Sequence, residues 1–484
     1  MADLTSEICG ITSPNPFWIA SAPPANSLRQ VDSAFSQGWG GVVWKTIGPP
    51  VMDTCMRYGG MDIGNTKLVG LNNIELISDR PFEVNIEEIA WIKNEWPEHA
   101  MIVSLMVESE QEAWHEAVKR CEQTGADGFE LNFGCPHGMS ERGMGSAVGQ
   151  VPEYIEMITA WVKEVATIPV IVKLTPNVTN IEITAAAAAR GGADAVSAIN
   201  TINSIVGLDV DTWDIRPSVG GLGTHGGYAG PAVKPIALNM VSAIAANPEI
   251  NLPISGIGGI STWRDAVEFM LLGSSTVQVC TAIMHHGFRI VEEMNAGLSN
   301  YLDGRGLESV QQLVGGAVPK VSTFNDLNLN FQVRAEVDES LCISCGKCIV
   351  SCKDSEVDCI SWETTNVLAA VGDPIALAGQ ARRVAHVDET ECIGCDLCSI
   401  VCPVDNCITM VPVDNGRPNV SWRDVTTELG VPGSIMAASE VTWDNFGEGI
   451  ERLNVSSPAH KHAPSQVPAR EAERRAIDLE LTDR

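Results

Sequence analysis

Residues 342–352 read CISCGKCIVSC, and residues 392–403 repeat the pattern as CIGCDLCSIVCP. Both runs have the C-x2-C-x2-C-x3-C spacing by which cysteine thiolates hold [4Fe–4S] clusters. In such paired runs three cysteines bind one cluster, and the fourth binds the other cluster. The spacing therefore predicts one cluster on Cys342, Cys345, Cys348 and Cys402, and a second on Cys392, Cys395, Cys398 and Cys352.

Zinc sites or disulfides are the alternatives for these cysteines. Zinc ribbons favour C-x2-C pairs separated by a longer loop, and a pattern of this length that occurs twice rarely arises by chance. Lys353 follows the first run where a proline is usual, whereas Pro403 follows the second. A chain with two such clusters carries electrons one at a time.

Length and composition describe a globular protein of at least two domains. The chain has 484 residues, 45% of them hydrophobic, which is more than one hydrophobic core usually accommodates. No apolar run approaches the length of a membrane span, and the first residues lack the basic and apolar regions of a signal peptide. Fifteen cysteines without an export signal indicate a reducing, cytoplasmic compartment. The net charge of −30 argues against nucleic-acid and membrane partners.

Residues 1–300 alternate short apolar runs with amphipathic stretches, which is typical of a parallel sheet covered by helices. Two Rossmann-type halves are the alternative, but no G-x-G-x-x-G follows the first expected strand. The pattern favours a (β/α)8 barrel. We expect strands at 17–21, 41–46, 102–106, 128–133, 169–175, 195–200, 252–260 and 276–282, and helices at 27–37, 109–124, 151–167, 179–190 and 262–272.

The expected fold class is therefore α/β, a TIM barrel followed by an α+β domain of the bacterial ferredoxin type. The barrel and its connector occupy 1–335, and the domain with two [4Fe–4S] clusters occupies 336–412. The gap at 353–391 is longer than a compact two-cluster domain needs, so we expect a surface insertion, helical over the alanine-rich 366–383. The C-terminal extension, 413–484, loses apolar periodicity and is expected to be partly disordered.

Polar and cationic side chains follow several of the expected barrel strands, at the end where barrel enzymes keep their catalytic groups. A glycine pair after the seventh strand and the backbone after the eighth suit a phosphate group, and two lysines at the same mouth suit a reduced flavin. Taken singly, each residue could be a strand cap or a turn. Together they predict a site for FMN, which can store two electrons received one at a time. The residues concerned are Lys45, Thr46, Asn132, Lys173, Asn200, Thr201, Gly258, Gly259, Cys280 and Thr281.

Cys135 begins a loop rich in glycine and methionine, at 138–145, that could close over this mouth. Isolated cysteines are commonly buried structural residues. A cysteine thiol is also mostly protonated at neutral pH, so Cys135 could instead donate a proton as a general acid. Both interpretations stay open at this point.

These motifs resemble a known family. The barrel is similar to class 1 dihydroorotate dehydrogenases, and residues 1–412 resemble the catalytic flavin and iron–sulfur subunit of NAD-dependent dihydropyrimidine dehydrogenases. The matching stretches are GWG at 38–40 with Lys45 and Thr46, NIELIS at 73–78, NFGCPHG at 132–138, ERGMG at 141–145, KLTPNVT at 173–179, Asn200 with Thr201, and the two cysteine runs.

The resemblance implies a site residue by residue. It implies FMN contacts at Ser21, Lys45, Thr46, Lys173, Gly230, Gly258, Gly259, Cys280 and Thr281. It implies pyrimidine contacts at Asn73, Asn132, Asn200 and Thr201. Cys135 would then protonate one carbon of the pyrimidine C5=C6 bond while FMN reduces the neighbouring carbon.

The resemblance also implies a partner, because no nicotinamide-binding fingerprint is visible in the sequence. A separate NAD(P)H-oxidising subunit with FAD and iron–sulfur clusters would supply electrons, and the assembly would be a hetero-oligomer. The family often has a further asparagine after the third strand, but residues 106–110 read MVESE without an amide. The alternatives are a dihydroorotate dehydrogenase-type enzyme, a related reductase of another ring, and an electron-transfer subunit whose barrel is not catalytic.

Overall fold

The chain folds into two compact units, Met1–Val321 and Ser322–Arg484. The structure, a computed structural model, describes residues 2–49, 57–64, 66–135, 143–355, 357–365 and 382–428. Most of the alanine-rich insertion and of the C-terminal extension, together with residues 136–142, therefore lie outside the described residues.

The first unit is built on a closed barrel whose neighbouring strands pair in parallel. Its strands follow chain order, and each lies within or beside a range expected from the sequence. This confirms the predicted TIM barrel, and the alternative of two Rossmann-type halves is wrong. The barrel strands are β3 (Phe17–Ile19), β4 (Gly41–Ile47), β7 (Ala100–Leu105), β8 (Gly128–Asn132), β9 (Val170–Lys173), β10 (Ala195–Ala198), β15 (Ile254–Ile257) and β16 (Ser274–Val279).

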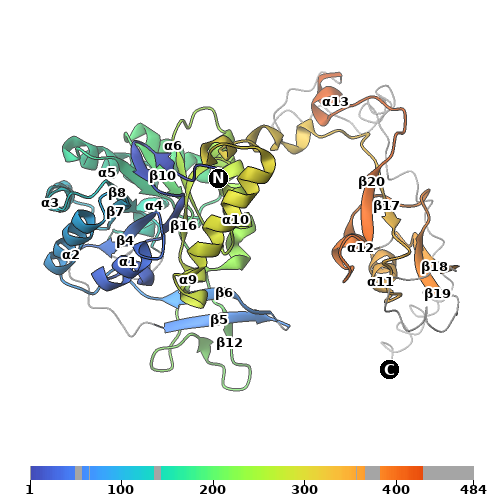
Figure 1. Cartoon of the computed structure of the whole chain (residues 1–484), viewed down its shortest axis with the longest axis horizontal. Coiled ribbons are helices and arrows are strands. Elements are labelled where there is room, and N and C mark those ends of the chain that lie inside the picture. The colour runs from blue at the N-terminus through green and yellow to red at the C-terminus, as the bar shows by residue number, and fades with distance from the viewer. Residues whose placement is uncertain are drawn as a thin grey trace, which may run out of the picture. The chain divides into compact units, whose positions relative to one another are not determined.

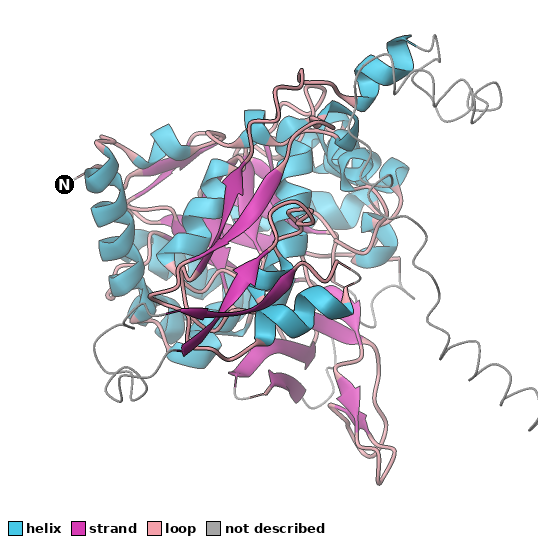
Figure 2. Cartoon of the chain, turned by 90° about the vertical axis from the view of Figure 1, so that its right-hand side faces the viewer, coloured by secondary structure: helices cyan, strands magenta, loops and turns pink. Residues whose placement is uncertain are grey.

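Helices form the outer layer of this unit, as Figure 1 shows for α1, α2, α3 and α5. Figure 2 draws the helices in cyan and the strands in magenta. Each turns an apolar side toward the barrel; in α1, Val31, Ala34 and Phe35 are buried in the common core. α8 begins with a capping box between Thr262 and Asp265. The helices are α1 (Leu28–Phe35), α2 (Phe82–Glu95), α3 (Gln111–Glu122), α4 (Ser146–Gly149), α5 (Pro152–Val165), α6 (Ile181–Arg190), α7 (Lys234–Ala246), α8 (Trp263–Leu271), α9 (Thr281–His286) and α10 (Ile290–Arg305), with short 3-10 turns at η1 (Pro23–Ala25), η3 (Pro231–Val233), η4 (Val310–Leu313) and η5 (Val318–Lys320).

Two small sheets flank the barrel. β1 (Ser6–Ile8) and β2 (Ile11–Ser13) form an antiparallel pair, and Ile8 and Ile11 pack against Trp18 of β3. A second sheet has the order β11-β14-β6-β5, and its β5 and β6 lie with β12 at one end of the unit in Figure 1. The strands are β5 (Arg57–Ile63), β6 (Thr66–Ile74), β11 (Ile202–Ser204) and β14 (Gly226–Ala229), beside a short pair of β12 (Gly207–Leu208) and β13 (Ile215–Arg216).

The four-stranded sheet was not expected from the sequence, because its segments are short or largely exposed. Glycines allow its strands to approach the loop segments closely. A Cβ on Gly226 would lie 2.2 Å from Asn72 Oδ1, and one on Gly227 would lie 2.4 Å from Thr201 Oγ1. Asn72 Nδ2 also donates to Ser204 Oγ (2.8 Å), which ties β6 to β11. The sheet thereby holds Asn73 of β6 next to Thr201, which follows β10.

The described part of the second unit contains two strand pairs, and two of its helices begin inside the cysteine runs. β17 (Val333–Val337) pairs with β20 (Ile408–Pro412), and β18 (Ile360–Thr365) pairs with β19 (Arg382–Val387). Cysteines of both runs form most of its buried core together with Ala335, Ile360 and Val384. The remaining elements are η6 (Phe324–Asp326), α11 (Lys347–Asp354), α12 (Leu397–Ile400) and α13 (Trp422–Glu428).

The helix expected over 366–383 lies outside the described residues except for Arg382 and Arg383, which belong to strand β19 instead. Of the C-terminal extension, 413–428 is described and includes the helix α13. Among the described helices, none combines the length and the apolarity that crossing a membrane requires.

Candidate active site and cluster sites

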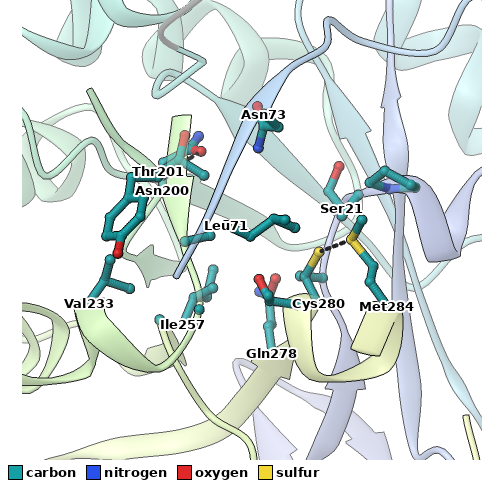
Figure 3. A pocket seen from close by; sticks show the side chains of 18 of the residues that line it. Ser21, Leu71, Asn73, Asn200, Thr201, Val233, Ile257, Gln278, Cys280 and Met284 are labelled. Carbon is teal, nitrogen blue, oxygen red and sulfur yellow. Dashed lines mark hydrogen bonds between the residues drawn. The ribbon is translucent and has the colours of Figure 1, made fainter. Parts of the chain in front are cut away.

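A cavity of about 1100 Å³, counted out to solvent at its mouth, lies at the end of the barrel where the strands finish. Strand-end residues form its floor and walls, and Asn73 of β6 and Tyr228 of β14 line it from the four-stranded sheet. Figure 3 shows Ser21, Asn200 and Cys280 around this space. Every barrel residue predicted to bind FMN or pyrimidine lines it, namely Ser21, Lys45, Thr46, Asn73, Asn132, Cys135, Lys173, Asn200, Thr201, Gly230, Gly258, Gly259, Cys280 and Thr281.

The two cavity lysines are each paired with a carboxylate. Lys45 Nζ lies 3.3 Å from Glu75 Oε1, and the Tyr58 hydroxyl donates to Glu75 Oε2 (2.5 Å). Lys173 Nζ lies 3.3 Å from Oε1 of Glu130, whose side chain is fully buried. Buried charges need such partners, because an unpaired charge away from water is strongly destabilising.

The Glu130 carboxylate is held by further polar groups of the barrel interior. Ser197 Oγ donates to Glu130 Oε2 (2.8 Å), and Gln278 Nε2 donates to the same oxygen (3.0 Å). The opposite atom of the Gln278 amide, Oε1, is buried and has no hydrogen-bond partner among the described residues. Gln278 lines the cavity beside Ile257 and Cys280, as Figure 3 shows, so a bound molecule could supply the missing donor.

A chain of amides and hydroxyls crosses the cavity wall. Asn200 Nδ2 donates to Asn132 Oδ1 (2.9 Å), and Asn132 Nδ2 donates to Thr46 Oγ1 (2.9 Å). The Thr46 hydroxyl also lies 3.0 Å from Ser21 Oγ. These contacts fix which edge of each amide donates and which accepts.

Cys135 lies three residues beyond the end of β8, buried in the lining of the cavity. Its backbone oxygen accepts from Ser146 N (3.1 Å), so the chain leaves and returns at the same point. A Cβ on Gly145, which has a φ of +59°, would lie 2.8 Å from that oxygen, so a glycine is needed for this closure. Ser109, in the segment where the family often has an asparagine, donates instead to Gly143 O (2.5 Å) and thereby anchors the same loop.

Glycines leave one wall of the cavity without side chains. Gly230, Gly258 and Gly259 all have positive φ, at +97°, +132° and +78°. A Cβ on Gly259 would lie 2.8 Å from Gly230 O, so the two backbone segments can approach only as glycines. Next to them, burial raises the pKa of the Cys280 thiol to about 12, so it stays neutral and contributes packing against Met284 (3.8 Å, dashed in Figure 3). Exposed backbone amides with two lysines nearby fit the phosphate and ring of FMN.

The cysteine runs surround two separate hollows in the second unit. Cys342, Cys345, Cys348 and Cys402 line one of about 350 Å³, together with Trp362 and Cys407. The other, of about 310 Å³, is lined by Cys352, Cys392, Cys395 and Cys398, together with Cys359. The fourth cysteine of each run thus lies with the three of the other run, which is the arrangement expected for two [4Fe–4S] clusters.

Both hollows fit a cluster better than a zinc ion. Four cysteines of the runs line each hollow and leave open space between them. A zinc site needs four ligands within about 2.3 Å of one point, whereas a cubane occupies a space between its thiolates. The geometry therefore disfavours the zinc alternative for the cysteine runs.

Sequence reasoning missed Glu75, Glu130, Gln278, Tyr58 and Tyr228, which line the cavity or hold the side chains that do. Glu130 precedes Asn132 by two positions on β8, and residues two apart share one face of a strand. That spacing was the available signal. The two tyrosines lie on the sheet that was not expected, so their approach to the cavity had no local signal.

Comparison with known proteins identifies both units. Residues 3–302 match the model of the dihydroorotate dehydrogenase family, and residues 335–410 match that of the 4Fe-4S dicluster domain. A solved dihydroorotate dehydrogenase of Eimeria tenella, in complex with ferulenol, covers 65% of this chain and 88% of its own, with a TM-score of 0.54 and 19% identity. That resemblance concerns the fold alone.

Curated relatives are more similar. The NAD-dependent dihydropyrimidine dehydrogenase subunit PreA of Escherichia coli (strain K12) is 41% identical over 410 residues, which make up 84% of this chain and 95% of that protein. The chloroplastic dihydropyrimidine dehydrogenase (NADP(+)) of Arabidopsis thaliana is 40% identical over 67% of this chain and 79% of its own. The catalytic subunit of dihydroorotate dehydrogenase B (NAD(+)) of Pyrococcus abyssi (strain GE5 / Orsay) is 38% identical over 65% of this chain and 99% of its own. The chain therefore belongs to the dihydropyrimidine dehydrogenase family, as a member that joins a dihydroorotate dehydrogenase barrel to a 4Fe-4S dicluster domain.

Proposed function

We propose that the chain reduces the C5=C6 double bond of a pyrimidine such as uracil or thymine to the 5,6-dihydropyrimidine, as an oxidoreductase acting on a CH–CH group. The observation that carries the proposal is the gathering of Cys135, two buried lysines and a chain of amides around one cavity. Membership of the dihydropyrimidine dehydrogenase family supports the same reaction.

FMN is the cofactor that this cavity suits. Lys45 and Lys173 would hold the ring, Thr46 and Ser21 would contact it, and the glycine wall with Cys280 and Thr281 would hold the phosphate. When bound, FMN stores two electrons that arrive singly through the clusters and delivers them to the pyrimidine as a hydride. The carboxylates of Glu75 and Glu130 keep the two ammonium groups in place beside the ring.

Asn73, Asn132, Asn200 and Thr201 would bind the pyrimidine. Amides can donate to its carbonyl groups and accept from its N–H groups, and the bonds among Thr46, Asn132 and Asn200 set their orientation in advance. A site already arranged in this way loses little entropy when the ring binds.

Cys135 would act as the general acid. Its position at the start of the loop closed by Ser146 places the thiol in the cavity lining, where it can protonate the carbon next to the one reduced. Met106 and Met144, which pack against Cys135, are apolar and supply no competing proton.

Electrons would come from a separate NAD(P)H-oxidising subunit with FAD and iron–sulfur clusters, within a cytoplasmic hetero-oligomer. Escherichia coli PreA is named as a subunit of an NAD-dependent enzyme, which supports this proposal. The eight cysteines of the two runs would hold the clusters that receive the electrons. Purified chain that reduces a pyrimidine with NADH and no second protein would contradict the need for a partner.

A dihydroorotate dehydrogenase activity is the second candidate, supported by the match of the barrel to that family. Its substrate carries a carboxylate, which calls for a cation in the cavity. In the described lining, however, the basic side chains are Lys45 and Lys173, and each already neutralises a glutamate. This charge balance favours a neutral pyrimidine.

An anaerobic single-turnover assay tests the proposal. Protein reduced with dithionite is mixed with uracil, thymine or orotate, and flavin reoxidation is followed by absorbance. Rapid reoxidation by uracil or thymine is expected. Rapid reoxidation by orotate alone would favour the second candidate, and reoxidation by none of the three would indicate a different ring or a non-catalytic barrel.

A further inference from the structure

Each cluster hollow is lined by one cysteine more than a [4Fe–4S] cluster needs. Cys359 lines the hollow of Cys352, Cys392, Cys395 and Cys398, and Cys407 lines the other hollow. Both extra cysteines are buried. Neither belongs to the C-x2-C-x2-C-x3-C runs, so the cluster assignment gives them no role.

The two extra thiols have different surroundings. Cys359 Sγ lies 3.5 Å from Cys352 Sγ, and Cys359 N donates to the same sulfur (3.4 Å). Cys407 Sγ donates to a backbone carbonyl, Asp338 O, at 3.8 Å, and its side chain also hydrogen-bonds with Cys402. A thiol has a single proton to donate, so Cys407 shares it between a carbonyl and a ligand sulfur, whereas Cys359 faces the ligand sulfurs of Cys352 and Cys392.

The position of Cys359 follows from the fold of the insertion. It lies directly before β18, and Asp388 N, directly after β19, donates to Cys359 O (2.8 Å). The hairpin therefore fixes the backbone of Cys359 at both of its strands. Ala335, Ile360, Leu397 and Met410 complete an apolar lining in which a hydrogen bond is stronger than in water.

Resting on the proposed cluster assignment, we propose that Cys359 is a positioning residue that sets the reduction potential of one cluster, by donating an S–H···S hydrogen bond to the Cys352 thiolate. Reduction adds a negative charge that is partly carried by the cysteine sulfurs. A donor to one of these sulfurs stabilises the reduced form, so it raises the potential. The corresponding contact of Cys407 with Cys402 is weakened by the competing carbonyl of Asp338, so the two clusters are expected to differ in potential although their cysteine runs have the same spacing.

The experiment compares Cys359→Ala with Cys359→Ser in the full chain. Redox titration followed by EPR gives the potential of each cluster, and iron content gives cluster occupancy. We expect Cys359→Ala to lower the potential of one cluster, with full iron content and an unchanged twin. Cys359→Ser keeps a hydroxyl donor and is expected to restore most of the difference. The backbone N–H contact survives both substitutions, so the comparison isolates the side chain.

Cys407→Ala is the matched control, because it removes a buried thiol of the same size beside the other hollow. It is expected to leave the potential of the cluster that responds to Cys359 unchanged. Equal potentials in the wild type and Cys359→Ala would overturn the inference. Loss of half the iron in Cys359→Ala would also overturn it, since Cys359 would then be a ligand. Wild-type protein that holds no [4Fe–4S] clusters would overturn the cluster assignment itself. Equal potentials, or loss of half the iron in Cys359→Ala, would leave that assignment in place.

Discussion

The barrel cavity and the cluster hollows are lined by different chemistry. The cavity has paired charges, Lys45 with Glu75 and Lys173 with Glu130, and a chain of amides and hydroxyls. The hollows are lined by thiols and by apolar side chains such as Ile360, Leu397 and Ile408. Electron transfer needs no proton donor, whereas reduction of a C=C bond needs both a proton and a fixed substrate. This difference in lining matches the proposed division of roles, with proton transfer in the first unit and electron transport in the second.

The largest effect is expected for Cys135→Ala, which removes the proposed proton donor. General acid catalysis contributes about 10²- to 10⁴-fold, so pyrimidine-dependent reoxidation of the flavin should slow by that order. Reduction of the clusters and the flavin by dithionite should stay as in the wild type. Cys121→Ala is the control, since Cys121 is buried in the core outside the cavity lining. If the Cys135 variant and the wild type reoxidised the flavin at equal rates, Cys135 would not be the proton donor of the barrel cavity.

A smaller effect is expected for Asn200→Ala, which removes an amide of the proposed pyrimidine site. One hydrogen bond contributes about 1 kcal/mol, so KM should rise roughly five- to tenfold with a smaller change in kcat. Asn247→Ala serves as the control, because the Asn247 amide bonds to Glu182 away from the cavity. If KM stays constant in the Asn200 variant, the chain of amides stabilises the cavity wall and does not bind the pyrimidine.

In the crossed arrangement, the fourth cysteine of each run binds the cluster of the other run. It predicts that one substitution removes half of the iron, and it predicts which substitutions remove the same cluster. Cys345→Ala and Cys402→Ala should each lose about four of eight irons and keep the same surviving cluster, since both cysteines line one hollow. Cys395→Ala should keep the other cluster, which is recognised by a different EPR spectrum. If Cys402→Ala resembled Cys395→Ala instead, each run would hold its own cluster.

The smallest effect compares one acidic residue of each unit. Burial alone would raise the pKa of Asp265, but Lys234, the Ser261 N–H and Thr262 outweigh it and leave this pKa below its usual range. Its contribution to stability is therefore present at neutral pH and is lost as the pH falls through the carboxyl pKa values. Asp265→Asn should cost about 1 kcal/mol at pH 7, and less as the pH falls through the pKa of the carboxyl in the folded chain.

Asp326 of the second unit is the counterpart. The Arg423 guanidinium, 2.6 Å away, and Thr323 lower its pKa to about 2, but this pair is exposed to solvent. Asp326→Asn should leave the melting temperature unchanged, because solvent screens exposed ion pairs. Calorimetry of both variants at pH 7 and pH 3 makes the comparison. An equal loss of stability in the two variants would show that burial does not decide the contribution.

Regular, repeated signals made most of the barrel and the cluster ligands predictable. Buried strands such as β4 and β7 are continuous apolar runs in the sequence. The cluster ligands of one run lie within a few residues of one another, so their spacing alone predicts that they bind together. The crossing of Cys352 and Cys402 required only the general rule for paired runs. The cavity residues at strand ends followed from the topology of the barrel, which brings all carboxyl ends together.

The remainder depended on contacts between distant segments. Glu75 and Glu130 were missed because a carboxylate in the sequence does not show which lysine it will meet. The sheet of β5, β6, β11 and β14 was missed because its strands are short or exposed, and because the close approach of β14 to its neighbours depends on Gly226 and Gly227. Ser109 could be read as a lost asparagine, but its bond to Gly143 is visible only in three dimensions.

The joining of Cys135 to Ser146 has a consequence for evolution and protein engineering. Because this bond joins two backbone atoms, it does not depend on the side chains that line the rest of the cavity. Substitutions elsewhere in the lining that keep this bond and Gly145 should leave the backbone of Cys135 in place. Selection can then alter which rings the cavity accepts while Cys135 keeps its position.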